Sequence, residues 1–218
     1  MPQFGLRGIY AAKYINNGGV VSHENIQHVG DAMTVNIELR SAEGRLYAED
    51  MLAEYMRKAT GGTISIGVKY IKQAAQMLLF NSRTKSREIS YTPAGASSPT
   101  TATVEGLVIG GQDEGQYVSV AFYAPDMIDG EKKYTCVLLN KALFGPPSMT
   151  LKTMGESIEF STPTTSGEFL ADDTPEQNLY DIAIVDNEAI AKAWVQAVLG
   201  GGNAANAAAG GSGGGSGT

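Results

Sequence analysis

The sequence predicts a mainly β protein, an antiparallel β-sandwich or barrel flanked by one or two α-helices. Three observations predict this class: many segments alternate apolar and polar residues, turn-forming stretches separate these segments, and only two stretches carry a helical period. The clearest alternation is AMTVNIELR, residues 32–40, in which Met33, Val35, Ile37 and Leu39 share one face. A half-buried strand is expected there.

Further strands are expected along most of the chain. They are predicted at residues 63–71, 104–109, 116–124, 132–140, 148–153 and 156–163. The stretches GGQDEG, PDMIDGE and FGPP separate some of them and have the composition of turns. Many strands with spaced turns are typical of antiparallel sandwiches and barrels.

Two helices are expected. The first is IKQAAQMLLFN, residues 71–81, and the second covers residues 187–199, with Asp186 or Asn187 as its cap and Gly200 as its stop. The apolar stripe of the first consists of Ile71, Ala74, Ala75, Leu78 and Leu79. The packing residues expected in the second are Ile190, Ala193, Trp194 and Val198.

Three segments read as irregular. Residues 41–62 join two predicted strands and are expected to form a loop, although they carry more apolar surface than a solvated loop needs. Residues 91–104, YTPAGASSPTTATV, are rich in Pro, Ser and Thr and are expected to form a long loop. Residues 200–218 are expected to be a flexible Gly/Ala/Ser-rich tail with the composition of a linker.

Composition narrows the function. The net charge of −7 argues against ordinary nucleic-acid binding, which draws on cations that release counterions from phosphates. No apolar run is long enough to span a membrane, and the start MPQFGLRG has no secretory apolar region, so we expect cytoplasmic synthesis and no membrane partner. The single cysteine excludes an intrachain disulfide and a cysteine-based zinc cluster.

Residues with catalytic or metal-binding potential are few. His23 and His28 fall in one predicted loop, and we expect them to face solvent because spacing supplies no third ligand. Cys136 lies in a predicted buried strand, so we expect a core thiol rather than a nucleophile. No GxSxG, GxGxxG or Walker-type loop is present. We therefore expect no enzymatic activity, no cofactor and no metal site.

Charged residues form two notable patterns. In NSRTKSRE, Arg83, Lys85 and Arg87 occupy alternate positions, which predicts either a basic interface stripe for an acidic partner or a solvated edge. Between Lys152 and Lys192 every charge is negative. These acids are Glu156, Glu159, Glu168, Asp172, Asp173, Glu176, Asp181, Asp186 and Glu188.

Four motifs occur in an order that resembles a known family. They are FGLRGIYAAKY at residues 4–14, GRLYAED at 44–50, GQYVSVAFYA to KKYTCVLLNKALFGPP within 115–147, and LKTMGESIEFSTPTTSGEF at 151–169. In this order and spacing they are similar to the major tail tube proteins of long-tailed bacteriophages. The resemblance covers about residues 3–170, and residues 1–199 are expected to form one tail tube domain.

The resemblance implies a structural role in a virion. Proteins of this family form rings of six copies in which one sheet of each copy joins a continuous barrel, and the rings stack into a tube for genome passage. It also implies the partners of such a tube, namely further copies of the chain, tail terminator, distal tail or baseplate and tape measure proteins, and non-specific proximity to DNA in the channel. The expected location is the virion tail, assembled in the host cytoplasm.

Specific residues acquire expected roles from this resemblance. Residues 1–16 are expected to hold an N-terminal arm that orders on assembly and the first strand. Residues 41–62 are expected to form an inter-subunit loop, unless that loop folds back on its own sheet. The candidate contacts between subunits or rings are Phe4, Leu6, Ile9, Tyr10, Leu46, Tyr47, Met51, Leu52, Tyr55 and Met56.

The acidic segment has two interpretations. Glu156 and Glu159 are candidates for the channel wall, where negative charge would keep DNA from adhering. The alternative is a solvated outer surface, which we favour for residues 172–188.

Two other functions remain open at this stage. One is the inner tube of a contractile tail, tailocin or secretion device. The other, from a different class, is a monomeric β-sandwich that binds carbohydrate or protein, such as an adhesin, although the chain lacks a secretion signal and an aromatic ligand platform.

Overall fold

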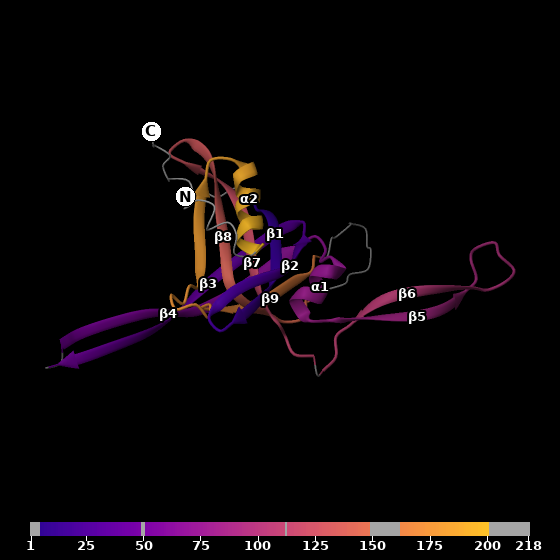
Figure 1. Ribbon diagram of the computed structural model, residues 1–218, viewed down its shortest axis with the longest axis horizontal. Helices are drawn as coiled ribbons and strands as arrows, with labels where there is room; N and C mark the ends of the chain where they lie inside the picture. The colour runs from indigo at the N-terminus through magenta and orange to yellow at the C-terminus, as the bar shows by residue number, and fades with distance from the viewer. Residues whose placement is uncertain (1–4, 49–50, 112, 149–161, 201–218) are drawn as a thin grey trace, which may run out of the picture.

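The computed structural model describes residues 5–48, 51–111, 113–148 and 162–200, and these are mainly β, as the sequence predicts. The elements, shown in Figure 1, follow one another along the chain. They are β1 (Arg7–Asn17), β2 (Val20–Gly30), β3 (Ala32–Ala48), β4 (Met51–Val68), α1 (Gln73–Phe80), β5 (Arg83–Tyr91), β6 (Thr100–Val108), β7 (Tyr117–Ile128), β8 (Glu131–Phe144), β9 (Thr164–Leu170), β10 (Tyr180–Val185) and α2 (Glu188–Leu199).

All described strand pairs are antiparallel. The main sheet has the order β2-β1-β7-β8-β9-β4-β3, and β10 also pairs with β8. One edge of β8 is shared between two strands, because its residues 134–139 pair with β10 and its residues 141–144 pair with β9. Strands β5 and β6 pair with each other and form a separate two-stranded sheet.

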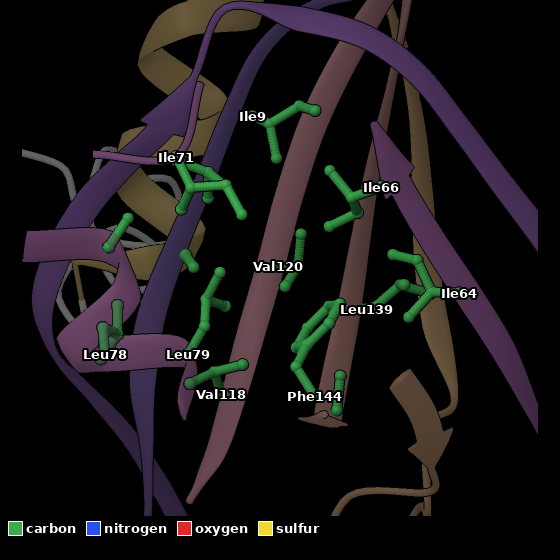
Figure 2. Packing of buried hydrophobic residues seen from close by; sticks show 14 of the residues in the cluster. Ile9, Ile64, Ile66, Ile71, Leu78, Leu79, Val118, Val120, Leu139 and Phe144 are labelled. Carbon is green, nitrogen blue, oxygen red and sulfur yellow. The ribbon is translucent and has the colours of Figure 1, made fainter. Parts of the chain in front are cut away.

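The main core lies where the two halves of the long sheet face each other. Ile64 and Ile66 of β4 meet Val120 of β7 and Leu139 of β8 in one buried cluster (Figure 2). Helix α1 closes one side of this cluster with Ala75, Leu78 and Leu79, which confirms the predicted stripe except for the exposed Ala74. Burial of these apolar side chains supplies the main driving force for the fold.

Helix α2 covers the opposite face of β1, β7 and β8. Its buried residues are Ala191, Val195 and Leu199, which pack with Ala12, Ala121 and Cys136. Of the predicted packing residues, Trp194 and Val198 are partly buried against this cluster, whereas Ile190 is 47% exposed and Ala193 is exposed. The helix cap is Asn187, whose Oδ1 accepts a hydrogen bond from the Ile190 N–H at 2.9 Å. Because both faces of β7 are covered, this strand is buried along nearly its whole length.

Two hairpins project from the body in opposite directions, as Figure 1 shows. One is the outer part of β3 and β4, and the other is β5 with β6. The predicted loop at residues 41–62 is wrong: its described residues continue the two strands. The loop predicted at residues 91–104 is shorter than expected, because β6 begins at Thr100. In both segments the strands are held mainly by cross-strand hydrogen bonds rather than by burial, which weakens the sequence signal.

Candidate functional site: two projecting hairpins and an open sheet edge

The outer part of the β3–β4 hairpin, residues 41–59, is called the β3–β4 arm here. Its strands stay in register from the Ser41–Ala59 pair outward to the Ala48–Met51 pair, with an irregularity between Leu46 and Tyr47. The inner half of β4 pairs with β9 on its other edge, from Gly62 to Gly67. The arm is therefore an extension of a strand whose root lies in the sheet of the body.

Two glycines allow the arm to leave the body. Gly61 has a φ of +140°, and a Cβ there would lie 2.5 Å from the Phe169 carbonyl oxygen. A Cβ on Gly62 would meet the Phe169 ring at 2.5 Å and the Glu38 carbonyl oxygen at 2.2 Å. Only glycine permits this close approach of β4 to its neighbours.

The β3–β4 arm carries large apolar side chains in solvent. Leu46 is 57% exposed, Met51 73% and Met56 74%, and Tyr47 and Tyr55 are also exposed. These are five of the six arm residues that the sequence nominated as contacts, and the sixth, Leu52, lies in β4 opposite Tyr47. A monomer gains nothing from apolar groups held in water, so the arm has the character of an unfilled interface.

One face of the arm is held by polar contacts. Glu43 lies 3.4 Å from Arg45 Nη2 and 3.7 Å from Arg57 Nε, and the Arg57 Nε–H donates to Ser41 Oγ at 2.8 Å. A hydrogen bond to Glu43 raises the pKa of the exposed Tyr55 hydroxyl. The register places Leu46 and Met56 on the other face, with Glu54 and Lys58.

The predicted N-terminal arm is corrected for its described part. The expected first strand is present as β1, which lies inside the sheet between β2 and β7, so residues from Arg7 onward belong to the body. Ile9 is fully buried in the core of its own chain and cannot contact a neighbour. Leu6 packs against the same core, and Tyr10 is half-buried with its ring edge-on to His28. Phe4 lies outside the described residues.

The basic stripe maps onto the β5–β6 hairpin. Arg83, Lys85 and Arg87 occupy alternate positions of β5, so the strand places all of them on one face, and every residue of β5 is exposed. At the root of the hairpin, Arg83 Nη2 lies 2.9 Å from Asp113 Oδ1. The structure therefore brings the three cations together as the sequence predicts.

Strands β10 and β3 each present an unpaired edge in the described part of the chain. Beside these edges lie exposed apolar side chains, including Met33 and Leu39 of β3 and Ile182 of β10. Two hollows open there, one of about 450 Å³ lined in part by Leu6, Met33 and Val35 and one of about 240 Å³ lined in part by Leu39 and Ile182. Sequence analysis missed this surface, although the alternation in YDIAIV, residues 180–185, is a signal for a strand.

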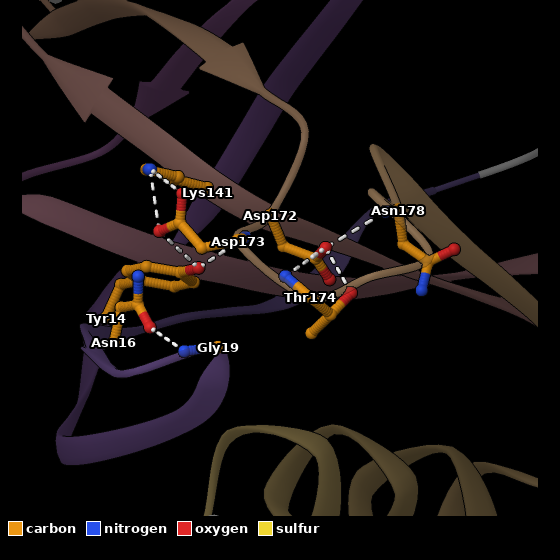
Figure 3. Close-up of polar contacts among 8 residues, drawn as sticks. All are labelled: Tyr14, Asn16, Gly19, Lys141, Asp172, Asp173, Thr174 and Asn178. Carbon is orange, nitrogen blue, oxygen red and sulfur yellow. Dashed lines mark hydrogen bonds and ion pairs between the residues drawn. The ribbon is translucent and has the colours of Figure 1, made fainter.

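Several residues of the acidic segment make contacts within the fold, although Glu176, Asp181 and Asp186 are exposed. Asp173 accepts hydrogen bonds from Tyr14 Oη at 2.9 Å and from Lys141 Nζ at 2.8 Å, as drawn in Figure 3. The Lys141 hydrogen bond lowers the pKa of the Asp173 carboxyl, and burial is the main cause that raises the pKa of Tyr14 to about 12. Lys141 Nζ also lies 4.7 Å from the centre of the Tyr117 ring.

The neighbouring Asp172 organises the connection between β9 and β10. Its Oδ1 accepts from the Thr174 hydroxyl at 2.6 Å and from the backbone N–H of Asn178 at 3.0 Å (Figure 3). Farther along, Asp186 lies 3.7 Å from Lys133. The favoured interpretation of residues 172–188 as a solvated surface is therefore wrong for the buried Asp172, whereas Asp173 and Asp186 lie at the surface and pair with lysines there. Glu156 and Glu159, the candidates for a channel wall, lie outside the described residues.

The two histidines and the cysteine are partly or fully buried. His23 and His28 lie on β2 with their rings edge-on to Tyr14 and Tyr10, so the expected solvent-facing loop is wrong, and burial lowers the pKa of both imidazoles. Burial raises the pKa of the Cys136 thiol to about 11. Among the described residues no group of three His, Cys, Asp or Glu side chains is placed to hold a metal ion.

Comparison with known proteins adds no relative. No protein-family model matches the chain, and no curated protein matches it. Within the described residues no helix is long and apolar enough to cross a membrane.

Proposed function

We propose that the chain is a structural subunit that assembles with copies of itself into stacked rings, forming the tail tube of a bacteriophage. The observation that carries the proposal is the β3–β4 arm, a paired extension of the body that holds large apolar side chains in solvent. The resemblance of the sequence to tail tube proteins supports the same function. No catalytic step is part of this role.

The energetics of the β3–β4 arm favour a partner. Full burial of one Leu or Met side chain contributes about 1.5–3 kcal/mol, and Leu46, Met51 and Met56 are all more than half exposed. The arm is already paired strand to strand, so docking it on another copy costs less conformational entropy than ordering a flexible loop would. A pre-formed apolar arm is suited to repeated, identical contacts.

The open edges favour lateral association of copies. An unpaired strand edge accepts another strand, and a closed ring of copies removes such edges altogether. The edges of β3 and β10 have exposed apolar residues beside them, so a neighbour would cover apolar surface and complete hydrogen bonds together. Hairpins that point in opposite directions also favour head-to-tail stacking over a closed dimer.

The proposed channel is supported by the sequence alone. A ring of chains that each carry a net charge of −7 would present DNA with a repelling environment. Glu156 and Glu159 are the residues we assign to the channel wall. Tail terminator, distal tail and tape measure proteins are the partners that such a tube requires, and the virion tail is its location.

The proposal is tested by removing the arm without disturbing its root. Residues 42–58 are replaced by Asn-Gly, a two-residue turn that suits a hairpin closed by the Ser41–Ala59 pair. We expect the native protein to form rings and tubes as concentration rises, observed by electron microscopy and sedimentation. The shortened protein is expected to stay monomeric and to keep its circular dichroism spectrum. A native protein that remains a monomer at high concentration contradicts the proposed function, and tubes formed by the shortened protein contradict the role of the arm.

A further inference from the structure

The β5–β6 hairpin has two faces of opposite charge. Strand alternation places Arg83, Lys85 and Arg87 on one face, and the pairing of Arg87 with Val104 adds an apolar side chain there. The other face carries Glu88 and Glu105, together with serine and threonine side chains. We call these the basic face and the acidic face.

Neither face is balanced within its own chain. Only Arg83, at the root of the hairpin, has a carboxylate within ion-pair distance among the described residues, whereas Lys85 and Arg87 have none. Glu88 and Glu105 are diagonal neighbours on their face, because Ser86 pairs with Glu105 and Glu88 with Thr103. The two carboxylates repel each other across this diagonal, and an isolated two-stranded hairpin is marginal in water.

The basic face also has a shallow hollow of about 250 Å³. Lys85, Arg87, Ile89, Val104 and Gly106 contribute to its lining. A Cβ on Gly106 would have the Lys85 carbonyl oxygen as its nearest neighbour, at 3.9 Å, so the space above this glycine is open. The surface is thus shaped to receive side chains of another molecule, and its charge requires an acidic one.

We propose that the β5–β6 hairpin of one copy docks on the same hairpin of a neighbouring copy, with the basic face of one against the acidic face of the other. This inference rests on the proposed function only in requiring that copies assemble. The two faces complement each other in charge, and such complementarity sets both the choice and the orientation of partners. Strand pairs packed face to face lie about 10 Å apart, a spacing that side chains of this length fill.

The geometry of this contact has a consequence for assembly. The two surfaces in contact are different, so each copy keeps one basic and one acidic face for further neighbours. Such a contact closes into a ring or continues along a stack. A nucleic acid is a weaker candidate for the basic face, because the acidic face of the same hairpin and the net charge of −7 would repel phosphates.

Charge reversal tests the contact. One variant carries Lys85→Glu and Arg87→Glu, a second carries Glu88→Lys and Glu105→Lys, and a third carries all four changes. Each of the first two is expected to raise the apparent dissociation constant of assembly ~10-fold or more, because two close charge pairs become repulsive. An equimolar mixture of the first two, and the third variant alone, are expected to restore assembly.

A control variant separates the effect of the hairpin from the effect of net charge. Glu114→Lys with Glu176→Lys changes net charge as much as the second variant but leaves the hairpin intact, and it is expected to assemble normally. Circular dichroism checks that every variant is folded. If the native protein forms tubes and neither reversal weakens them, the inference is wrong while the proposed function stands. Loss of assembly in both reversals without rescue in the mixture also overturns it.

A cross-linking experiment detects the contact independently of tube formation. Lys85→Cys protein is mixed with Glu105→Cys protein and treated with a bis-maleimide whose span matches the spacing of about 10 Å, which is too wide for a disulfide. A cross-linked mixed pair is expected that neither protein forms efficiently alone. The native Cys136 is fully buried and its pKa is raised to about 11, so it does not compete. Cross-linking without tubes would support the contact and contradict the tube. Absence of the mixed pair in assembled material would overturn the contact.

Discussion

The two hairpins differ in how they are attached to the rest of the molecule. The β3–β4 arm continues a strand whose inner half is paired on both edges and buried at Ile64 and Ile66. The β5–β6 hairpin pairs only with itself in the described part of the chain, and it is exposed along nearly its whole length. The β3–β4 arm has a root in the core, while the β5–β6 hairpin has none in the described part of the chain.

This difference indicates two kinds of association surface. The β3–β4 arm can be stable before it meets a partner, because its register is fixed at Gly62 to Gly67 by β9. The β5–β6 hairpin depends on its own cross-strand pairs, and like charges lie together on each of its faces. Rooted apolar strands suit strong contacts, whereas an unrooted charged hairpin suits contacts that set orientation.

The largest effect is expected from the root of the β3–β4 arm. Phe169 of β9 is fully buried against Gly62, and Phe169→Ala removes a ring from a close-packed site. We expect the free energy of unfolding to fall by about 3–5 kcal/mol, measured by denaturant titration. The neighbouring Leu170 is 41% exposed, and Leu170→Ala is expected to change stability by less than about 0.5 kcal/mol. Equal effects of the two changes would contradict a buried root.

A smaller effect, on assembly alone, is expected from the tip. Leu46→Ser with Met56→Ser removes two exposed apolar groups from one face of the β3–β4 arm. The free energy of unfolding should change by less than about 1 kcal/mol, while assembly followed by sedimentation should weaken ~10-fold or more. The control is Val20→Ser with Met127→Ser, which removes two exposed apolar groups outside the arm. Equal weakening of assembly by this control would remove the distinction between the arm and the rest of the surface.

The smallest effect is expected in the body, away from both hairpins. Burial holds the Tyr14 pKa at about 12, above its ordinary value of 10, so the folded state favours the neutral phenol. This contribution to stability is complete below pH 10 and is lost as pH rises through 12. Tyr14→Phe should cost about 1 kcal/mol at pH 8, for the lost hydrogen bond to Asp173, and should make the decline above pH 10 shallower.

Denaturant titrations between pH 8 and pH 12 measure this profile. Tyr91→Phe, at an exposed position of the β5–β6 hairpin, is the matched control and should leave the profile unchanged. An unchanged profile in Tyr14→Phe would show that the Tyr14, Lys141 and Asp173 contacts do not influence stability.

The body was more predictable from the sequence than the hairpins, for a physical reason. The strand at residues 63–68 buries Ile64, Ile66 and Val68, and the helix at residues 73–80 likewise buries one face, so burial leaves a period in the sequence. The β3–β4 arm has both faces in solvent in a single chain, so Leu46, Glu54 and Met56 share a face without forming an alternating pattern. Because this alternation is absent, the sequence predicted a loop at residues 41–62 instead of two strands.

The candidate site was predictable in part. Strand geometry alone was enough to predict that the alternate cations of β5 share one face. The number of apolar residues in the β3–β4 arm was enough to predict that some of them are exposed. Burial of Ile9 could not be read from the first residues, because it depends on β1 being inserted between β2 and β7, which come later in the chain. The pairing of Asp173 with Lys141 and Tyr14 likewise joins residues that are distant in sequence.

Continuity of β4 from the tip of its hairpin into the core has a mechanical consequence. A tension applied between the tip and the body runs along β4, so the backbone hydrogen bonds that join its residues Gly62 to Gly67 to β9 resist together in shear. Peeling bonds one at a time would require a pull across the strand. A column built through such joints would resist stretching at each level with many parallel bonds.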